Sequence, residues 1–470
     1  MLNMKEKTTN LPKHGGLRNV KNGVFWSSRY ISNAVTNTLF TSYISFYATD
    51  VLGMPLGMIA TVLLVTRLFD GVTDLIAGFI VDNTRTRFGK ARPYDWCIPF
   101  IALFTILTFS APNAAPMVQA VYVGAMYILT QAVFGTLLGA SDNVYMLRAF
   151  PNDKERNNVF GICTVFGQLV SLVLGVLIPK WVSAAGVIQR EWTKMVIFST
   201  VPIAAIGMIR FFTIKEVVVD EPVIKTDGKK EKKQGVSFKD GIRAIVENKY
   251  ILILTLAIFT IVIASGFLNT SAAYYFTYFV GDIGQMSVIA IASFASLIML
   301  VIFVPLANLF GKGKVMKVSL LIALGGCILR WIGGTNMITM SVGLALMMFG
   351  IMPISVYFPL FLFDIIDYSE WKTGKRVESV LAVFPNFANK VAAGLSVSLG
   401  GFVMGAAGYV GGLETQSEST MRAIDMSFNA IPTILLGIMS AFVFVFYNLD
   451  KLMPQVKEEL DARRKAQQET

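Results

Sequence analysis

Long apolar stretches alternate with short polar loops along almost the whole chain. About twelve of these stretches are long enough to cross the ~30 Å hydrocarbon core of a bilayer. They start near residues 24, 55, 94, 118, 158 and 193 in the first half, and near 250, 286, 314, 338, 380 and 428 in the second. The pattern predicts an all-α, polytopic membrane protein with twelve transmembrane helices.

One internal segment breaks this pattern. Residues 215–249 contain the run DGKKEKKQG and have no apolar face, which is typical of a linker. We therefore divide the chain into an N-terminal six-helix bundle (1–214), a cytoplasmic linker (215–249), a C-terminal six-helix bundle (250–450) and a cytoplasmic tail (451–470). Similar glycine-rich and basic loops follow the second and eighth stretches, which indicates a duplicated six-helix unit.

Composition and charge agree with a membrane protein. Hydrophobic residues make up 54% of the chain and charged residues only 15%, against roughly 25% charged in soluble domains. The formal net charge of +11 comes from Lys and Arg concentrated in alternate short loops. That is the positive-inside pattern rather than a nucleic-acid surface, and it predicts that both termini are cytoplasmic. The polar N-terminal residues also argue against a cleavable signal peptide.

The reactive side chains exclude several classes of site. The three cysteines lie singly in separate apolar stretches, which argues against a disulfide framework or a thiolate metal site. The one histidine, His14, lies in the polar N-terminal segment, so a Ser–His nucleophile inside the bilayer is excluded. We expect no enzyme activity and no cofactor, and any proton relay in the membrane must use carboxylates.

Asp70 and Asp74 stand four residues apart inside an apolar helix. Carboxylates in a bilayer are expensive and persist mainly where they bind an ion, relay a proton or pair with a cation. This spacing places both on one helix face, where they supply oxygens to Na⁺ or Li⁺ or share a proton. Thr73, between them, adds a hydroxyl oxygen. The alternative is that Arg67 and Lys390 only neutralise the acids, but two acids on one helix exceed what one structural pair requires.

Lys390 is a lone positive charge deep in the eleventh apolar stretch, and it needs an anionic partner. The second-helix aspartates are the expected partners, either as a structural brace or as part of the coupling mechanism. Asp364 and Asp367, at the end of the tenth stretch, are candidates for a gate held by ion pairs; simple interfacial charge is the alternative.

Substrate contacts are harder to predict from residue type. Asp142 and Asn143 lie near the end of the fourth stretch, where they face either a cavity or a loop. Tyr357 is one of several tyrosines that could stack on a sugar ring, although aromatic residues also anchor helices at membrane interfaces.

Several motifs together resemble the glycoside–pentoside–hexuronide:cation symporter family of the major facilitator superfamily. They are ATDVLG at 48–53, R-x-x-D-x-x-x-D at 67–74, DNTRTRFGKARP at 82–93, NDKER at 152–156 and D-x-x-D-Y-S-E-W-K-T-G-K-R-x-E-S at 364–379, followed by Lys390. The resemblance implies the major facilitator fold and cation-coupled sugar transport. It also implies cation ligands at Asp70, Asp74 and Thr136, and it matches Lys390 to the family lysine in helix eleven.

The sugar-binding positions depart from the family pattern. By ungapped spacing, the family acid of helix one falls at Ala34, beside Asn33, and that of helix four falls at Gly139. A family tryptophan nearby falls at Asn143. Either the substrate differs, or Asn33, Asp142 and Asn143 replace these contacts from shifted positions. We also group Arg156, in the NDKER motif, with Asp364 and Asp367 as gating residues.

These observations predict symport of a glycoside or oligosaccharide with Na⁺, Li⁺ or H⁺ by alternating access, in the plasma or inner membrane. The alternatives are a lipid or amphiphile carrier on the same fold and, less favoured, a non-transporting sensor. A sensor should have lost the ion site first, yet Asp70, Asp74 and Lys390 are all present. The linker either binds a regulator or carries solvated charge. The oligomeric state is left open, with a monomer as a reasonable expectation.

Overall fold

The computed structural model describes residues 16–217, 245–374 and 378–468, and these ranges are almost entirely helical. In them, extended pairing is limited to one isolated bridge between Thr86 and Gly89. The all-α prediction is therefore confirmed. His14 and most of the predicted 215–249 linker lie outside the described residues.

The first half of the chain forms six helical rods, several of them built from more than one segment. Their bounds are α1 Gly16–Thr38, η1 Leu39–Tyr43, α2 Ile44–Phe46 and η2 Tyr47–Val51; α3 Leu56–Asn83; η3 Arg92–Trp96 and α4 Cys97–Thr108; α5 Pro116–Tyr127, η4 Ile128–Gly135 and α6 Thr136–Ala149; α7 Asp153–Ala185; α8 Gln189–Gly207 and α9 Ile209–Thr213.

The second half repeats this arrangement and ends in one additional helix, α20. The bounds are α11 Lys249–Tyr275 and η5 Phe276–Val280; η6 Ile283–Met286, α12 Ser287–Ala292 and α13 Phe294–Phe310; α14 Lys312–Gly333; α15 Met337–Val356 and α16 Phe358–Thr373; α17 Glu378–Ala406; α18 Glu418–Asp425, η7 Met426–Ala430 and α19 Ile431–Phe446; α20 Leu449–Gln468.

Nine helical segments of the described chain are long and apolar enough to cross a bilayer. The other three predicted crossings are the rods that contain α1, α3 and α4. Polar residues interrupt α1, and charged residues interrupt α3 after its apolar first part, Leu56–Arg67. The third rod has only 12 α-helical residues because it opens with a 3₁₀ turn. Together the rods make the twelve predicted crossings.

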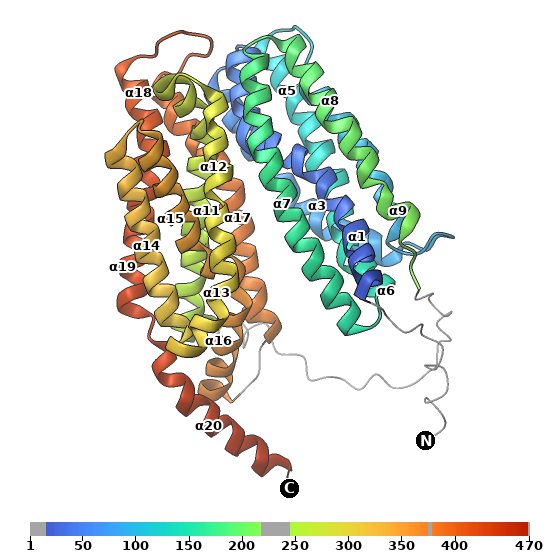
Figure 1. Cartoon of the computed structure of the whole chain (residues 1–470), viewed down its shortest axis with the longest axis vertical. Helices are drawn as coiled ribbons and strands as arrows, with labels where there is room; N and C mark the ends of the chain where they lie inside the picture. Colours follow the sequence, from blue (N-terminus) through green and yellow to red (C-terminus); the bar gives the residue numbers. More distant parts are fainter. Residues whose placement is uncertain (1–15, 218–244, 375–377, 469–470) are drawn as a thin grey trace.

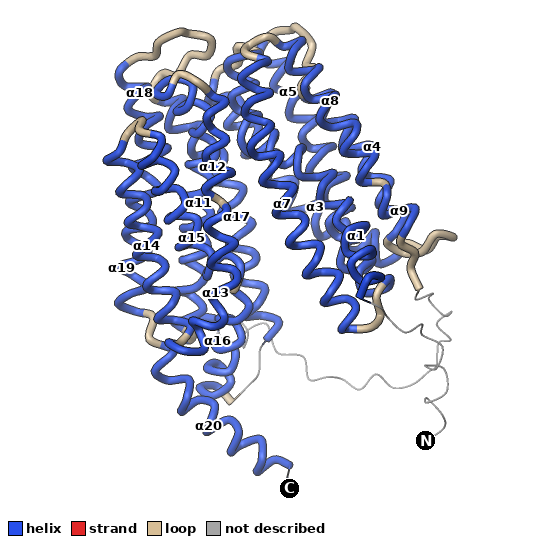
Figure 2. Tube along the Cα trace, in the orientation of Figure 1, coloured by secondary structure: helices blue, strands red, loops and turns tan. Residues whose placement is uncertain are grey.

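Figure 1 shows two bundles side by side, with α1 to α9 in one and α11 to α19 in the other. The bundles touch at the end of the molecule where α18 lies, and their ribbons diverge toward the end where α20 lies (Figures 1 and 2). We call these the α18 end and the α20 end. The molecule is thus closed between its halves at the α18 end.

Small residues let helices of the two halves approach closely. In the antiparallel pair α3–α17, a Cβ atom on Gly405 would lie 3.1 Å from the backbone nitrogen of Gly57, and one on Gly401 would lie 3.0 Å from the Cβ of Ala60. In the pair α7–α12, a Cβ atom on Gly175 would lie 2.6 Å from that of Ala290. Such close helix contact is typical of small residues in membrane interfaces.

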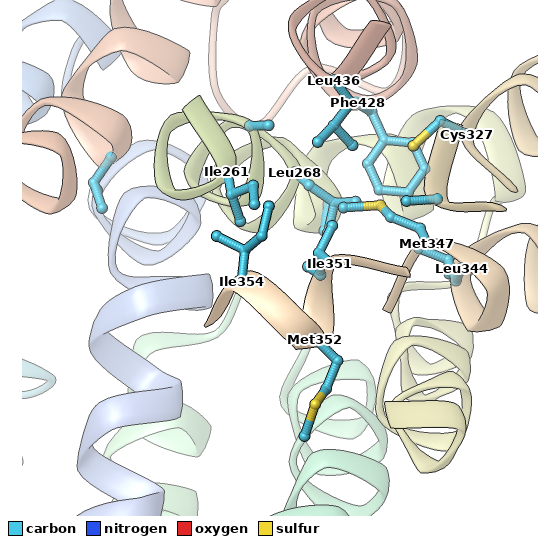
Figure 3. Packing of buried hydrophobic residues seen from close by; sticks show 14 of the residues in the cluster. Ile261, Leu268, Cys327, Leu344, Met347, Ile351, Met352, Ile354, Phe428 and Leu436 are labelled. Carbon is cyan, nitrogen blue, oxygen red and sulfur yellow. The ribbon is translucent and has the colours of Figure 1, made fainter. Parts of the chain in front are cut away.

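The core of the second half is packed by aliphatic, sulfur-containing and aromatic side chains. Figure 3 shows Ile261 and Leu268 of α11 beside side chains of α15, with Phe428 and Leu436 of the last transmembrane rod closing the cluster. Cys327 of α14 is fully buried in it and acts as a small apolar residue. This core holds the helices that carry the polar residues described below.

Several transmembrane rods contain π-helical turns, which insert an extra residue into the helical repeat. They occur as η1 and η2 in the first rod, η4 in the fourth, η5 in the seventh and η7 in the last. Such turns are rare and frequently mark functional sites. Because η4 directly precedes Thr136, it changes the direction in which the residues after Gly135 point.

Candidate functional site

The predicted cation-binding segment lies in the middle of α3. Arg67 donates from Nη1 to Oδ2 of Asp70 over 3.3 Å, and both side chains are about one-quarter exposed. The guanidinium of Arg67 also lies 5.7 Å from the ring centroid of Tyr127, on α5. Asp74 follows one turn later on α3; its side chain lies outside the described part of the structure.

The two predicted hydroxyl ligands are oriented by their own helices. The Oγ1 of Thr73 donates to the carbonyl oxygens of Phe69 and Asp70, at 3.0 and 3.1 Å. The Oγ1 of Thr136 donates to the carbonyl of Gln131, five residues earlier in the π-helical turn, at 3.2 Å. Since each hydrogen is directed to a carbonyl, the lone pairs of both oxygens remain able to accept or to coordinate.

Helix packing places Thr136 at the depth of the aspartates. Helices α3 and α5 run parallel, and a Cβ atom on Gly124 would lie 3.0 Å from a methyl group of Val62. Asp74 lies as many residues beyond Val62 as Thr136 lies beyond Gly124. Because the same number of residues separates each pair along parallel rods, Thr136 lies at the same depth in the bundle as Asp74. The π turn shifts this correspondence by at most one residue.

The contact between α3 and α17 brings Lys390 to the same depth. A Cβ atom on Gly394 would lie 3.3 Å from the Cβ of Arg67. The helices run in opposite directions, so Lys390, four residues before Gly394, is level with the residues just after Asp70. Lys390 is exposed on α17. Asp70 and Lys390, although 320 positions apart in the chain, thus lie at a similar depth on two helices that pack together across the boundary between the two halves.

Asp142 is placed in a buried ion-pair network of the first half. Its Oδ2 lies 2.8 Å from Nη2 of Arg29, and its Oδ1 accepts from Nη1 of Arg210 over 2.8 Å. Arg210 is fully buried, pairs also with Asp95, and stacks its guanidinium 4.7 Å from the ring centroid of Trp26. Two cations and two anions balance one another here, which satisfies the requirement that buried charges be paired.

The remaining predicted substrate residues are dispersed. Asn33 is half-buried on α1, and Asn143 is exposed on α6. The hydroxyl of Tyr357 donates to the carbonyl of Leu300 over 2.5 Å, and its ring stacks on Phe303 with centroids 4.4 Å apart. Tyr357 therefore ties the start of α16 to α13.

The predicted gating residues lie at the α20 end. Asp364 is buried and forms an ion pair with Lys312, which also donates to the carbonyl of Leu360 over 3.0 Å. This contact joins α16 to α14 within the second half. Asp367 is half-buried one turn later on α16, and Arg156 is half-buried in the first turn of α7, in the first half.

Asp50, which was not predicted as a site residue from the sequence, links the two halves at the α18 end. Asp50 of η2 accepts from the hydroxyl of Tyr409 at 2.7 and 2.8 Å, from that of Tyr278 at 3.2 Å, and from the backbone N–H of Gly412 at 3.2 Å. All three donors belong to the second half. In the sequence, this site is marked only by an acidic residue at the end of an apolar stretch. The site could not be predicted from it, because the partners of Asp50 in the second half lie more than 220 residues away in the chain.

At the α20 end, a carboxylate organises the loop between α3 and η3. Glu216 accepts from the backbone N–H groups of residues 90, 91 and 92 at 2.7–3.0 Å, and from Nε of Arg148 at 2.6 Å. Burial alone raises the pKa of Glu216, but these hydrogen bonds outweigh it, so the pKa lies below its ordinary value. In the second half, Asp450 holds the loop before α14 in a similar way, accepting from the Gly313 and Lys314 N–H groups at 2.6 and 3.1 Å.

Comparison with known proteins identifies what this arrangement is similar to. Residues 30–451 match the family described as MFS/sugar transport protein. The chain is 27% identical to the isoprimeverose transporter of Lactiplantibacillus pentosus, covering 94% of this chain and 93% of that protein. It is 25% identical to a putative sulfoquinovose importer of Escherichia coli (strain K12), covering 92% and 91%.

The fold is also found in solved structures of low sequence identity. A bacterial homologue of the human lysosomal transporter Spinster superposes with a TM-score of 0.61 at 13% identity, covering 94% of this chain and 98% of that one. A D-xylose–proton symporter superposes with a TM-score of 0.57 at 12% identity, covering 93% and 98%. The predicted twelve-helix major facilitator fold is therefore confirmed.

Proposed function

Because this chain belongs to the family of MFS sugar transport proteins, we propose that it couples the transport of a glycoside or oligosaccharide to a cation. The observation that carries the proposal is the common depth of Asp70, Asp74, Thr136 and Lys390 on three packed rods. Two carboxylates and two hydroxyl oxygens form a ligand set suited to a hard monovalent cation, and the same carboxylates suit a proton.

The position of this set explains how a cation would act on transport. Asp70 belongs to the first half and Lys390 to the second, and the contact between α3 and α17 is part of the boundary along which the halves must move. A cation at the aspartates replaces the attraction between them and Lys390. Its binding thereby changes the relative free energy of the two arrangements of the halves, which is what coupling requires. Coupling free energies of this kind are typically ~1–3 kcal/mol.

The positive-inside pattern supports an orientation with the α20 end, and both termini, on the cytoplasmic side. In this orientation the Asp50 cluster closes the molecule toward the outside, while the halves diverge toward the cytoplasm. The proposed cycle then alternates between this arrangement and one in which the α18 end opens and the α20 end closes. Sugar and cation enter together from the outside and leave together into the cytoplasm.

The substrate class is supported by the relatives, which include a transporter of isoprimeverose and a glucuronide carrier homologue of E. coli. A lipid or amphiphile carrier finds no support among them. We expect polar groups of the first half to select the sugar, and Asn33, half-buried on α1, is the candidate there. Asp142 acts through the network with Arg29 and Arg210 rather than alone.

Uptake into energised vesicles tests the proposal. The protein is supplied with radiolabelled glycosides under an imposed Na⁺ gradient or an imposed pH gradient, and accumulation above equilibrium is measured. Asp74→Asn is expected to abolish uphill accumulation while leaving exchange down a gradient measurable. Glu414→Gln, which removes an exposed carboxylate from the loop before α18, is the matched control and should accumulate normally.

The outcomes separate the parts of the proposal. Accumulation that requires Na⁺ assigns that ion to the aspartates, whereas accumulation driven by the pH gradient alone assigns a proton. Undiminished uphill uptake by Asp74→Asn would refute the cation site, and no uptake of any glycoside would refute the substrate class.

A further inference from the structure

An apolar groove lies on the surface of the second half. It runs between α13, α14 and α15 and has a volume of about 430 Å³. Its walls include Met299, Leu306 and Phe310 of α13, Val318 and Ile322 of α14, and Phe349 of α15. Ser319, its one hydroxyl-bearing wall residue, donates to the carbonyl of Met316 over 2.9 Å, so the groove offers no unsatisfied hydroxyl donor.

The groove spans the depth of a single leaflet. It extends along α14 from Lys314, in the first turn at the α20 end, to Ile322, eight residues later. At 1.5 Å per residue this is about 12 Å, close to the ~15 Å hydrocarbon depth of one leaflet. The surface around it is apolar: Leu309 is 76% exposed and Val318 is 58% exposed. In the membrane, this groove therefore faces acyl chains.

A positive charge stands at the mouth of the groove. Three lysines occupy the first turns of α14, and two of them are engaged: Lys312 pairs with Asp364, and Lys317 donates to the carbonyl of Phe444 over 3.0 Å. The side chain of Lys314 is exposed and lines the mouth, and among the described residues its ammonium has no hydrogen-bonding partner. The neighbouring carboxylate of Asp450 accepts from the backbone N–H groups of Gly313 and Lys314.

We propose that this groove binds one acyl chain of an anionic phospholipid, with the headgroup phosphate against the ammonium of Lys314. The chain fills an apolar surface of leaflet depth, and the phosphate supplies the anionic partner that Lys314 lacks among the described residues. A zwitterionic lipid presents the same chain, but its own ammonium offsets the phosphate charge. The bound lipid is a stable component of the second half rather than transported cargo, because no residue of the cation set lines the groove.

Native mass spectrometry of the purified protein tests this proposal. The protein is titrated with phosphatidylglycerol, with phosphatidylcholine of the same acyl chains, and with glycerol 3-phosphate, which has the anionic headgroup without the chains. We expect phosphatidylglycerol to bind most tightly and glycerol 3-phosphate to bind weakly. Lys314→Gln should weaken phosphatidylglycerol binding about fivefold and leave phosphatidylcholine unchanged, as one basic residue near a phosphate is worth about that factor.

Two further variants make the test specific. Lys457→Gln removes an exposed lysine of α20 that does not line the groove, and it should bind phosphatidylglycerol like the unmodified protein. Val318→Trp fills the groove from the exposed face and should weaken both phospholipids. Equal binding of the two phospholipids, equal effects of Lys314→Gln and Lys457→Gln, or glycerol 3-phosphate binding as tight as phosphatidylglycerol would each overturn the proposal. None of these measurements depends on sugar transport.

Discussion

Several charged residues of the first half are compensated by ion pairs although they are buried. Arg210 is the clearest case, because it is fully buried yet bridges Asp95 and Asp142 and lies against Trp26. The network joins α1, η3, α6 and α9, so its four charged groups tie the first half together. In the proposed cycle each half moves as a unit and needs such internal connections, whereas the contacts between the halves break.

Replacing Arg210 should therefore destabilise the protein strongly. In Arg210→Met, two acids keep only Arg29 as a cationic partner, and breaking a buried ion pair costs about 3–5 kcal/mol of unfolding free energy. Lys194→Met is the control, since the Lys194–Glu191 pair is 2.7 Å long but largely exposed, and such pairs contribute less than about 1 kcal/mol. Chemical unfolding in detergent measures both. Similar losses in the two variants would contradict the structural role of Arg210.

Among the connecting elements, the loop between α3 and η3 depends on one carboxylate. Glu216 follows α9 in sequence but accepts three N–H groups of this loop. The space is restricted, because a Cβ atom on Gly89 would lie 2.5 Å from the Glu216 carboxyl carbon, and Gly89 has a φ of +120°. The basic loop is thus fixed to the end of the last helix of its own half, and Asp450 fixes the corresponding loop of the other.

The lowered pKa of Glu216 makes this contact pH-dependent. A carboxylate whose pKa is lower in the folded state stabilises that state fully above its ordinary pKa, near 4.5, and the contribution is lost as pH falls further. Glu216→Gln should therefore lower the free energy of unfolding at pH 7 by about 2 kcal/mol. This loss should appear as a lower thermal unfolding midpoint. The difference between the variant and the unmodified protein should shrink below pH 4. A difference that stays as large well below pH 4 as it is at pH 7 would contradict this account.

The helices themselves could be predicted well where their apolar stretches are long. The starts expected near 118, 250 and 314 correspond to helices beginning at Pro116, Lys249 and Lys312. The first helix begins earlier than expected, at Gly16 instead of 24, because its first turns are polar and give no hydropathy signal. The π turns were not predicted either, since they change the register of a helix without changing its composition.

The contacts among charged residues were less predictable. Asp70, Asp74 and Lys390 could be selected because a charge in an apolar stretch needs a reason, and packing brings their helices together. Asp142 is also a charged residue near an apolar stretch, but its partner Arg210 lies 68 positions away in the chain. Only the packing of α6 against the end of the sixth rod shows that its carboxylate is already paired.

At the scale of the whole molecule, the two ends are built differently. Contacts between halves at the α18 end include charge-assisted hydrogen bonds to Asp50 and a 3.0 Å bond from Ser183 to Asp282. The carboxylate contacts described at the α20 end, those of Glu216, Asp364 and Asp450, each stay within one half. The Asp50 cluster is therefore a main determinant of how stable the arrangement closed at the α18 end is.

Asp50→Asn should shift the molecule toward the arrangement that is open at the α18 end. The amide removes the negative charge that the hydroxyls of Tyr278 and Tyr409 bond to, and hydrogen bonds to charged groups contribute about 1.5–3 kcal/mol. A loss of 1.4 kcal/mol changes the ratio of two states about tenfold. Spin labels at the exposed positions Ala115 and Glu414, one in each half at this end, report the change as a longer distance.

A second label pair and a control variant make that measurement decisive. Labels at the exposed positions Asn158 and Lys372 lie in opposite halves toward the α20 end, and their distance should shorten as the first one lengthens. Glu418→Gln removes an exposed carboxylate whose ion pair, among the described residues, is with Arg422 of its own helix, so it should leave both distances unchanged. If Asp50→Asn also leaves both unchanged, Asp50 does not hold the halves together. If only the α18-end distance grows, the halves separate there without the reciprocal motion that alternating access requires.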